Sequence, residues 1–513
     1  NAFDAEYGRF RGAVINASIR SGTNEFHGAL FEFVRNSAFN ARDPFATSIP
    51  QFGYHLFGGS VGGPVYLPRL YNGRNRTFFF FNYEGSREGV PRANVNTVPT
   101  VLQRQGDFSD TRVRSGNTIS PVTIYDPATT RQQGAAYVRD VFPGNRIPQN
   151  RFDPVARNIL AMFPLPNSPG DSVTAANNYL LSFKDPVLDN GYVYRIDHRF
   201  SDAHAVFFRY SWRHFRVRRQ GALKNELTGD YDDRNTPGVA LDNTITLNPT
   251  TVLNLRYGFS RYLQLQAADT LGYDMRGLGF PASLLPQLTA QAVPTITISG
   301  YTTLASAAKQ TKNAEDSHTV RGGVSKVSGR HSLRFGGEGR LIHSNSTSLP
   351  GGAAGSYSFN STFTRGPNPQ ATSVTAGHAL ASYLLGAVAS GSVAYNAAPA
   401  DTGTYYGTYW QDDIRVTSKL NLNLGLRYEI EGPYTERYNR LNRGYDFGVD
   451  SPINAAVRAA YALSPIPEVP ASSFQLRGGL LFAGVNGVPR ALTDLDKDNF
   501  APRIGAAYSL TPK

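Results

Sequence analysis

The sequence of 513 residues contains no cysteine. This absence excludes disulfide scaffolds, thiolate zinc sites and cysteine nucleophiles. Long apolar runs are also lacking, since none reaches the ~18–20 residues that a membrane-spanning helix requires. There is no initiator methionine and no charged-then-apolar leader, and the sequence stops directly after a strand-like run. We therefore expect an internal piece of a longer protein.

Arginine and aromatic residues are abundant in the sequence. Lysine is scarce, with eight residues against 43 arginines, and the formal net charge is +12. Aromatic residues make up 12% of the chain, a load that argues against disorder. The basic residues are spread over the whole chain and form no single footprint, so we expect no nucleic acid partner. An anionic lipopolysaccharide outside or an anionic solute inside explains the arginine excess more simply.

Alternation of apolar and polar residues is the strongest pattern. Residues 420–430 read LNLNLGLRYEI, in which one parity is wholly apolar and the other is polar or glycine. Successive side chains of a strand point to opposite faces, so such a segment has one apolar and one polar face. The pattern predicts an all-β fold of about twelve strands, near residues 25–35, 53–65, 76–87, 192–200, 205–213, 239–247, 253–260, 316–327, 331–343, 404–416, 420–430 and 499–509.

The connections between these strands alternate strictly between short and long. The short ones are residues 66–75, 201–203, 248–250, 328–330 and 417–418, and the long ones are 36–52, 88–190, 216–238, 264–315, 344–403 and 432–498. A transmembrane antiparallel β-barrel has short periplasmic turns and long extracellular loops. A soluble antiparallel sheet with one solvated face shows the same alternation, but loop asymmetry, strand count and aromatic content favour the barrel.

In such a barrel the polar parity faces the lumen. Charged side chains fall on that parity in most of the expected strands, where they would meet water instead of hydrocarbon. They are the candidate ligand-binding residues of the lumen: Arg195, Arg199, Arg209, Arg256, Arg334, Arg340, Asn423 and Arg427.

Motifs for catalysis and metal binding are incomplete. Residues 58–62 have the G-x-S-x-G spacing of a serine hydrolase, but Gly63-Pro64 follows where that motif needs a helix. Three aspartates at 494–498 begin like a calcium loop and lack its later glycine and glutamate. We therefore expect no enzyme activity, no catalytic residue, no cofactor and no metal site, while a loose calcium site there or at 230–233 stays open.

Several segments carry a family resemblance. They are Ala5–Phe10 with Gly12–Asn16, Ser21–Gly28, Phe142–Pro148 with Arg151–Ala156, Arg195–Ser201, Tyr409–Asp413 with Leu422–Glu429, and Asn499–Gly505. In this order, over essentially the whole chain, they resemble TonB-dependent outer-membrane receptors, specifically the Oar-like branch abundant in Acidobacteria.

This resemblance implies a barrel of 22 strands occluded by an N-terminal plug. Residues 1–23 would be the tail of the plug, and residues 24–513 the first half of the barrel. The bulk of the plug, the TonB-contacting box and a carboxypeptidase-regulatory-like domain would lie outside this sequence.

The implied function is uptake of a large or scarce solute across the bacterial outer membrane. The solute could be an oligosaccharide, a peptide or a metal chelate, and the implied partners are a periplasmic TonB-type protein, outer-membrane lipids and lipopolysaccharide. A non-transporting surface or adhesion protein that displays binding loops is the alternative. An open diffusion porin is a third hypothesis. The plug-like residues 1–23 argue against it.

Two local expectations follow. Residues 404–431 should form a hairpin with a periplasmic turn at Thr417-Ser418. Its outward residues should be Leu420, Leu422, Leu424 and Leu426, and its inward residues Asn421, Asn423 and Arg427.

Residues 88–190 are rich in proline, which removes backbone donors, and should form a folded extracellular cap near the ligand vestibule. Residues 155–163 should be a short helix in it, with Ile159, Leu160 and Phe163 packed inward.

Overall fold

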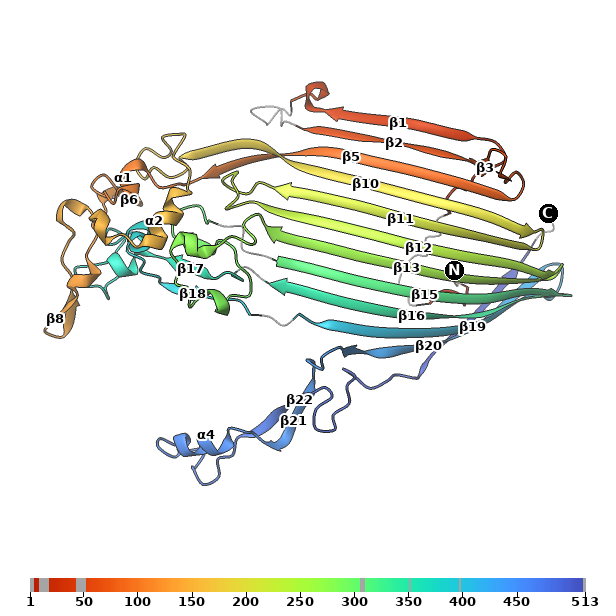
Figure 1. Ribbon diagram of the computed structural model, residues 1–513. Coiled ribbons are helices and arrows are strands. Elements are labelled where there is room, and N and C mark those ends of the chain that lie inside the picture. The colour runs from red at the N-terminus through yellow and green to blue at the C-terminus, as the bar shows by residue number, and fades with distance from the viewer. Residues whose placement is uncertain are drawn as a thin grey trace.

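Twelve long strands form one antiparallel sheet, in which each strand pairs with the next one of the sheet along the chain (Figure 1). The structure, a computed structural model, describes residues 4–8, 18–42, 52–304, 310–349, 352–395 and 398–510. The strands of the sheet are β1 (His27–Asn36), β2 (Gly53–Pro64), β5 (Thr77–Asn96), β10 (Tyr179–Ser201), β11 (His204–Arg219), β12 (Asp230–Asn248), β13 (Thr251–Ala268), β15 (Gln310–Ser328), β16 (His331–Leu349), β19 (Ala400–Arg415), β20 (Leu420–Glu436) and β23 (Asn499–Tyr508). The predicted all-β fold is confirmed, and each alternating segment coincides with one strand.

The strands are longer than a bilayer needs. β10 has 23 residues and β5 has 20, whereas a tilted strand crosses a bilayer with ~9–11 residues. The sheet therefore continues well beyond the membrane on the side of the long connections. Among the described residues, no helix is long and apolar enough to cross a membrane.

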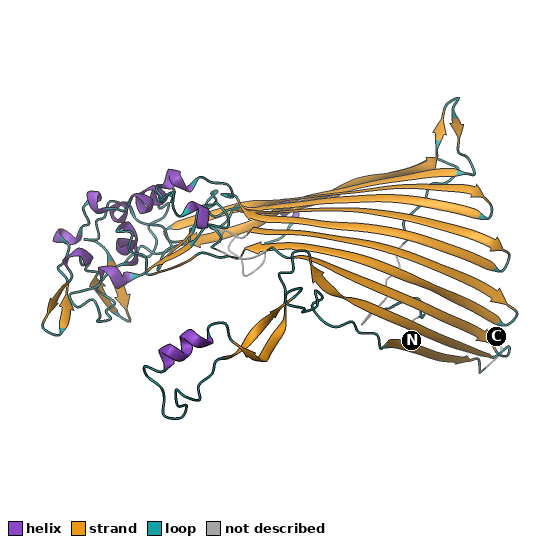
Figure 2. Ribbon diagram, turned by 60° about the horizontal axis from the view of Figure 1, so that its bottom comes forward, coloured by secondary structure: helices purple, strands orange, loops and turns teal. Residues whose placement is uncertain are grey.

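All short connections lie at one end of the sheet and the long ones at the other (Figures 1 and 2). The short ones are the segment 65–76, with its small hairpin of β3 (Tyr66–Leu67) and β4 (Tyr71–Asn72), and the turns 202–203, 249–250, 329–330 and 416–419. Since membrane barrels have short periplasmic turns and long extracellular loops, the turn end is periplasmic. The predicted hairpin around Thr417-Ser418 is confirmed, with Arg415 paired to Asn421.

Segments of four long connections fold together at the extracellular end. We call them the cap, which comprises residues 97–178, 220–229, 269–304 and 352–395. One hydrophobic cluster takes buried side chains from every one of these segments, among them Phe108, Leu223, Ile296 and Tyr383. The cap therefore has a core of its own.

Short elements make up the cap. Its α-helices are α1 (Val101–Arg104), α2 (Pro154–Ala161) and α3 (Ala379–Leu384). Its strands are β6 (Arg112–Ser115), β7 (Thr118–Pro121), β8 (Arg131–Gln133), β9 (Ala136–Val138), β14 (Thr295–Ile298), β17 (Ser356–Phe359) and β18 (Ser390–Ser392). Its 3-10 helices are η2 (Pro127–Thr129), η3 (Pro143–Asn145), η4 (Gln149–Arg151), η5 (Met275–Leu278), η6 (Leu285–Gln287) and η7 (Ser361–Thr364), while η1 (Ser37–Phe39) follows β1 outside the cap.

The predicted helix at 155–163 is present as α2. Asp153 caps it by accepting a hydrogen bond from the backbone N–H of Ala156 at 2.9 Å, and Pro154 at the first helical position needs no partner for a missing N–H. The three residues predicted to pack inward are buried in the cap core: Ile159, Leu160 and Phe163.

The loop expected over residues 88–190 is shorter at both ends, because β5 and β10 extend into it. Two prolines of the expected loop, Pro91 and Pro186, lie within these strands. Pro91 lies beyond Gly89, where the pairing of β5 with β2 ends, and Pro186 precedes Val187, where the pairing of β10 with β11 begins. Each proline thus has a free strand edge beside it, where a missing N–H breaks no ladder.

The segment 437–498 projects separately from the extracellular end of β20 (Figure 2). It contains the paired strands β21 (Asn442–Asp450) and β22 (Arg477–Phe482) and the helix α4 (Asn454–Tyr461). No residue of α4 is buried, and Phe447 and Leu463 are 80% and 87% exposed. This segment has no core comparable to that of the cap.

The two faces of the sheet differ in chemistry. One face carries a row of register partners without charge, Ile196, Phe208, Leu241, Tyr257 and Val320, on five successive strands. The even-numbered residues of β20 up to Gly432 lie on this outward face, as predicted for its leucines. The opposite face carries the arginines selected from the sequence and is the lumen side.

Candidate solute-facing wall

A belt of charged residues crosses the lumen face near its middle. Asp242, Arg256, Arg321 and Glu338 are successive register partners on β12, β13, β15 and β16. Arg256 pairs with Asp242 at 2.5 Å, and Arg321 donates through Nε to Glu338 Oε2 at 2.7 Å. The alternation of strand residues explains this arrangement, because charges of one parity from four strands meet in one row.

Glu338 receives three arginines. Besides Arg321, Arg340 donates to its carboxylate at 3.1 Å, and Arg427 donates through Nη2 to Oε1 at 2.8 Å. The side chains of Arg427 and Glu338 are 1% and 4% exposed. A buried carboxylate needs such partners, since an unpaired buried charge is costly.

Arg427 also holds Glu429 and Tyr405. Its Nε donates to Glu429 Oε1 at 2.6 Å, and its Nη2 donates to the Tyr405 hydroxyl at 2.7 Å. The guanidinium lies over Gly407, where an added Cβ would come within 2.5 Å of Nη2. Glycine at 407 thus makes room for Arg427 on the wall.

Residues 4–8, which precede the first strand, lie against this part of the wall. Arg427 Nη1 donates to the backbone carbonyls of Ala5 and Glu6 at 3.3 and 3.1 Å. The N–H of Ala5 donates to Gln411 Oε1 at 2.7 Å, and Ala5 is fully buried. Gly8 contacts Glu429 and Arg427 so closely that a Cβ there would collide with both side chains. The segment is therefore fixed to the lumen face by backbone hydrogen bonds.

Asp4 anchors the same segment through its side chain. Arg334 donates to Asp4 Oδ2 and to Asp413 Oδ2, each at 2.5 Å. Asn423 donates to Asp413 Oδ1 at 3.0 Å, and Arg503 donates to the backbone carbonyl of Asp4. Gln411 of β19 also donates to Asp4 Oδ1 at 3.1 Å, so three strands, β16, β19 and β23, contact this acidic residue of the N-terminal segment.

A second part of the N-terminal segment lies on β10. Arg195 donates through Nη1 to the carbonyl of Ile19 at 2.8 Å and pairs with Asp197 at 2.7 Å. Ser21 donates to Asp197 Oδ2 at 2.7 Å. Arg199 lines a cavity of about 520 Å³ together with residues 21–24.

Arg209, like Arg199, has no ion pair within the described residues, whereas the other five predicted lumen arginines have one. Arg209 is the register partner of Arg195, and its Nε is buried without a hydrogen-bond partner among the described residues. The described part of the chain supplies no ion pair for Arg209, so its charge remains available to an anion.

The eight predicted lumen residues all lie on one face, in two groups. Arg195, Arg199 and Arg209 lie on β10 and β11, and the other five lie on β13, β16 and β20. Sequence reasoning missed the residues that pair with them, chiefly Asp242, Arg321, Tyr405, Gln411 and Asp413. Parity would have placed these on the lumen face, but their pairing depends on the register between strands.

A calcium site at residues 230–233 is not formed. Asp232 pairs with Arg234 on the lumen face, whereas Asp233 pairs with Arg216 on the outward face. No group of three or more potential metal-ligating side chains occurs in the described ranges. The aspartates at 494 and 498 do not converge on one site either, since Asp494 pairs with Arg443.

The family follows from a match over nearly the whole chain. Residues 18–513 match a family model described as "Outer membrane beta barrel domain", and the protein belongs to this family. It is a protein of the bacterial outer membrane. No curated protein matches its sequence.

Solved structures of outer-membrane transporters and receptors are similar to this chain. The outer membrane transporter YddB from Escherichia coli is 11% identical, with a TM-score of 0.48, over 85% of this chain and 43% of that one. The ferric enterobactin receptor PfeA from Pseudomonas aeruginosa (a G324V mutant) is 10% identical, with a TM-score of 0.35, over 81% of this chain and 41% of that one. The siderophore receptor PirA from Acinetobacter baumannii is 10% identical, with a TM-score of 0.36, and has the same two coverages. This chain thus spans less than half the length of these proteins.

Proposed function

We propose that the protein takes up a large or scarce solute through a plugged barrel, with energy from a periplasmic TonB-type protein. The observation that carries this proposal is the position of residues 4–8 and 18–22. They precede β1, and side chains of the lumen face hold them through Asp4, Ala5 and Ile19. A chain segment fixed inside the barrel ahead of its first strand suits a plug, and an open porin has no need of one.

On this proposal residues 1–23 are the tail of a plug, and residues 24–513 are the first half of a barrel of about 22 strands. The open edges β1 and β23 would then receive further strands, since unpaired strand edges invite pairing. Residues 1–3 and 9–17 of this tail lie outside the described residues. We assign the protein to the Oar-like branch of TonB-dependent receptors on the motifs of its sequence.

The lumen arginines suggest a solute with acidic or hydrogen-bond-accepting groups. Arg199 and Arg209 are the best candidates for direct contact, because neither has an ion pair within the described residues that would neutralise its charge. An anionic oligosaccharide, an acidic peptide and a metal chelate all present such groups. The cap would form the vestibule that the solute enters first.

A non-transporting surface or adhesion protein is the second candidate. The exposed apolar side chains of the segment 437–498, including Phe447 and Leu463, favour it, since apolar groups gathered outside a core mark interaction surfaces. In this reading the barrel only anchors the binding loops.

Uptake by the complete protein in a host without competing receptors tests the proposal. Labelled ferric chelates, oligosaccharides and peptides would be offered to matched cells with and without TonB. We expect accumulation of one class, lost without TonB and reduced in Arg209→Gln. Lys326→Gln, a change on the outward face, is the matched control. Accumulation that persists without TonB would mean a porin, and surface binding without accumulation would mean the adhesion protein.

A further inference from the structure

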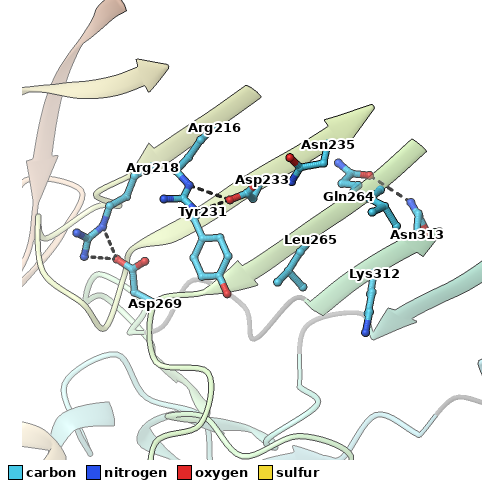
Figure 3. Close-up of a pocket in the computed structure, with 11 residues that line it drawn as sticks. Arg216, Arg218, Tyr231, Asp233, Asn235, Gln264, Leu265, Asp269, Lys312 and Asn313 are labelled. Atoms are coloured by element: carbon cyan, nitrogen blue, oxygen red, sulfur yellow. Dashed lines mark hydrogen bonds and ion pairs between the residues drawn. The ribbon is translucent and has the colours of Figure 1, made fainter. Parts of the chain in front are cut away.

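A cavity of about 630 Å³ lies on the outward face of the sheet, at the extracellular ends of β11, β12, β13 and β15 (Figure 3). The side chains that matter most in it are Arg216, Arg218, Tyr231, Asp233, Leu265 and Lys312. It is separate from the lumen wall that the proposed function uses.

Strand register places this cavity on the lipid side. Arg216 and Arg218 have the parity of Phe208 and Trp212, which point away from the lumen. Arg216 is the register partner of Asp233, and Asp233 is the partner of Leu265. Leu265 in turn pairs with Lys312. Two strands, β12 and β13, thus separate Arg216 and Lys312 on one outward row.

The position of this outward row relative to the membrane follows from two lysines of β15. Lys312 and Lys326 are 14 residues apart on the same face of this strand, which is ~46 Å along the strand at ~3.3 Å per residue. A tilt of ~40° reduces this to ~35 Å across the membrane, more than the ~30 Å hydrocarbon core. The two lysines therefore lie beyond opposite surfaces of that core.

An aromatic pair lies below the cavity on the same outward face. Tyr192 and Trp212 stack with their rings 5.3 Å apart, and aromatic girdles mark the interfaces of membrane barrels. Arg216 lies four residues further along β11 than Trp212, towards the cap. The cavity is therefore at the level of the headgroups of the outer leaflet, below the cap.

The charges in the cavity favour an anion. Arg216 donates to Asp233 through Nε at 2.8 Å, and Arg218 donates to Asp269 at 3.0 Å, but both arginine side chains are more than half exposed. The hydrogen bonds of Arg216 and Arg218 to these carboxylates, within the described residues, use Nε and Nη2 and leave Nη1 of each arginine unused. Lys312 is exposed and has no ion pair with any described residue. Three cations thus face two carboxylates, above an apolar floor that includes Leu265.

We propose that this cavity binds a phosphate group of lipid A, the anionic lipid that fills the outer leaflet of the outer membrane. Arg216, Arg218 and Lys312 bind the phosphate, and the leucine floor contacts the adjoining sugar and acyl chains. Arginine forks and lysine ammonium groups are the usual protein ligands of phosphate, and surface cations strengthen attachment to anionic lipid. The site goes beyond the proposed function and does not depend on transport.

Binding of lipid A to the complete protein in detergent tests this site. Arg216→Gln/Arg218→Gln/Lys312→Gln is compared with Arg213→Gln/Arg219→Gln/Lys326→Gln, a triple variant that removes two lumen-facing arginines of the same strand and the periplasmic lysine of β15. We expect about tenfold weaker binding in the first and less than about twofold change in the second, because charge-assisted contacts are lost only in the first. Lys312→Gln alone, which breaks no ion pair within the described residues, should weaken binding while Lys326→Gln does not.

Two further probes separate lipid from free anion. Lipid A without its phosphates should bind the unaltered protein as weakly as lipid A binds the first triple variant. Inorganic phosphate should not displace lipid A. Equal binding by the two triple variants would overturn the site, and so would equal loss in the two single-lysine variants. Displacement by inorganic phosphate would show a free-anion site and would overturn the lipid assignment. Heat-dependent migration in gels checks that each variant contains a folded barrel.

Discussion

The hydroxyl of Tyr383 donates a hydrogen bond to the backbone carbonyl of Ala156 at 2.9 Å, although 227 residues separate the two. Tyr383 belongs to α3 and Ala156 to α2, and both are buried in the cap core. The bond ties two extracellular connections of the barrel together. The cap is therefore one folded unit, and its parts depend on each other.

Tyr383→Phe should loosen the cap without affecting the barrel. A buried hydrogen bond of this kind contributes about 1 kcal/mol, so we expect about fivefold faster hydrogen exchange in α2 and α3. Tyr137→Phe is the matched control, because Tyr137 lies in the cap and is exposed. Equal exchange in both variants would show that the bond contributes nothing.

Removal of residues 99–177 should expose the other cap segments. Deletion of this stretch removes Ile159 and Leu160 from the core that they share with Leu380 and Leu384. We expect an inserted barrel whose segments 269–304 and 352–395 are cut rapidly by protease, and no solute binding. A deletion of residues 100–185 would also remove part of β10 and is a poorer test. Protease resistance of the remaining segments would mean that they fold independently.

The cap should lose stability when the pH falls. His378 is buried between Phe108 and Tyr301, with ring distances of 5.0 and 6.0 Å, and burial lowers the pKa of His378 to about 4. The unfolded cap binds this proton at its ordinary pKa near 6.5, so stability is complete above that pH. It falls as the pH drops from about 6.5 to about 4, by ~1.4 kcal/mol for each unit of pKa difference.

Protease sensitivity of the cap at pH 7 and pH 5 measures this effect. His378→Gln cannot take up the proton, and its sensitivity should be nearly the same at both values. An identical pH response in the variant and the unaltered protein would assign the effect to other groups.

The strands could be predicted from the sequence, because alternation within ten residues decides a strand and its outward face. The residues of β20 show this, since the parity of Leu424 and Arg427 alone assigned them to opposite faces. The cap core could not be predicted, because Phe108, Leu223 and Tyr383 meet only through folding of distant segments. Parity placed Glu338 on the lumen face, but its ion pairs could not be predicted, for a similar reason. Its partners Arg321 and Arg427 lie 17 and 89 residues away, and only the register brings them together.

Arg427→Met should release the N-terminal segment. Loss of one partner from a buried ion pair costs ~3–5 kcal/mol, and we expect the lower part of this range because Glu338 keeps Arg321 and Arg340. The chain has no cysteine, so Glu6→Cys provides a single label for residues 4–8. Thiol labelling should be faster in Arg427→Met than in Arg256→Met, whose arginine does not contact the segment through any hydrogen bond of the described residues. Equal labelling would mean that the wall does not hold the segment.

The outward face offers a test of membrane depth. Val320 is 59% exposed and lies six residues from Lys326 on β15. Six residues of a tilted strand span ~15 Å across the membrane, which places Val320 close to the membrane midplane. Leu424 lies on the same face but is the register partner of Asp412, in the row that contains Lys326 and Leu333. An arginine at the midplane costs ~2–4 kcal/mol and one near the interface ~0–1 kcal/mol. Val320→Arg should therefore lower the unfolding free energy of the barrel much more than Leu424→Arg. Ser260→Arg, on the lumen face, should be tolerated. Similar losses at all three positions would indicate a sheet without a lipid-covered face.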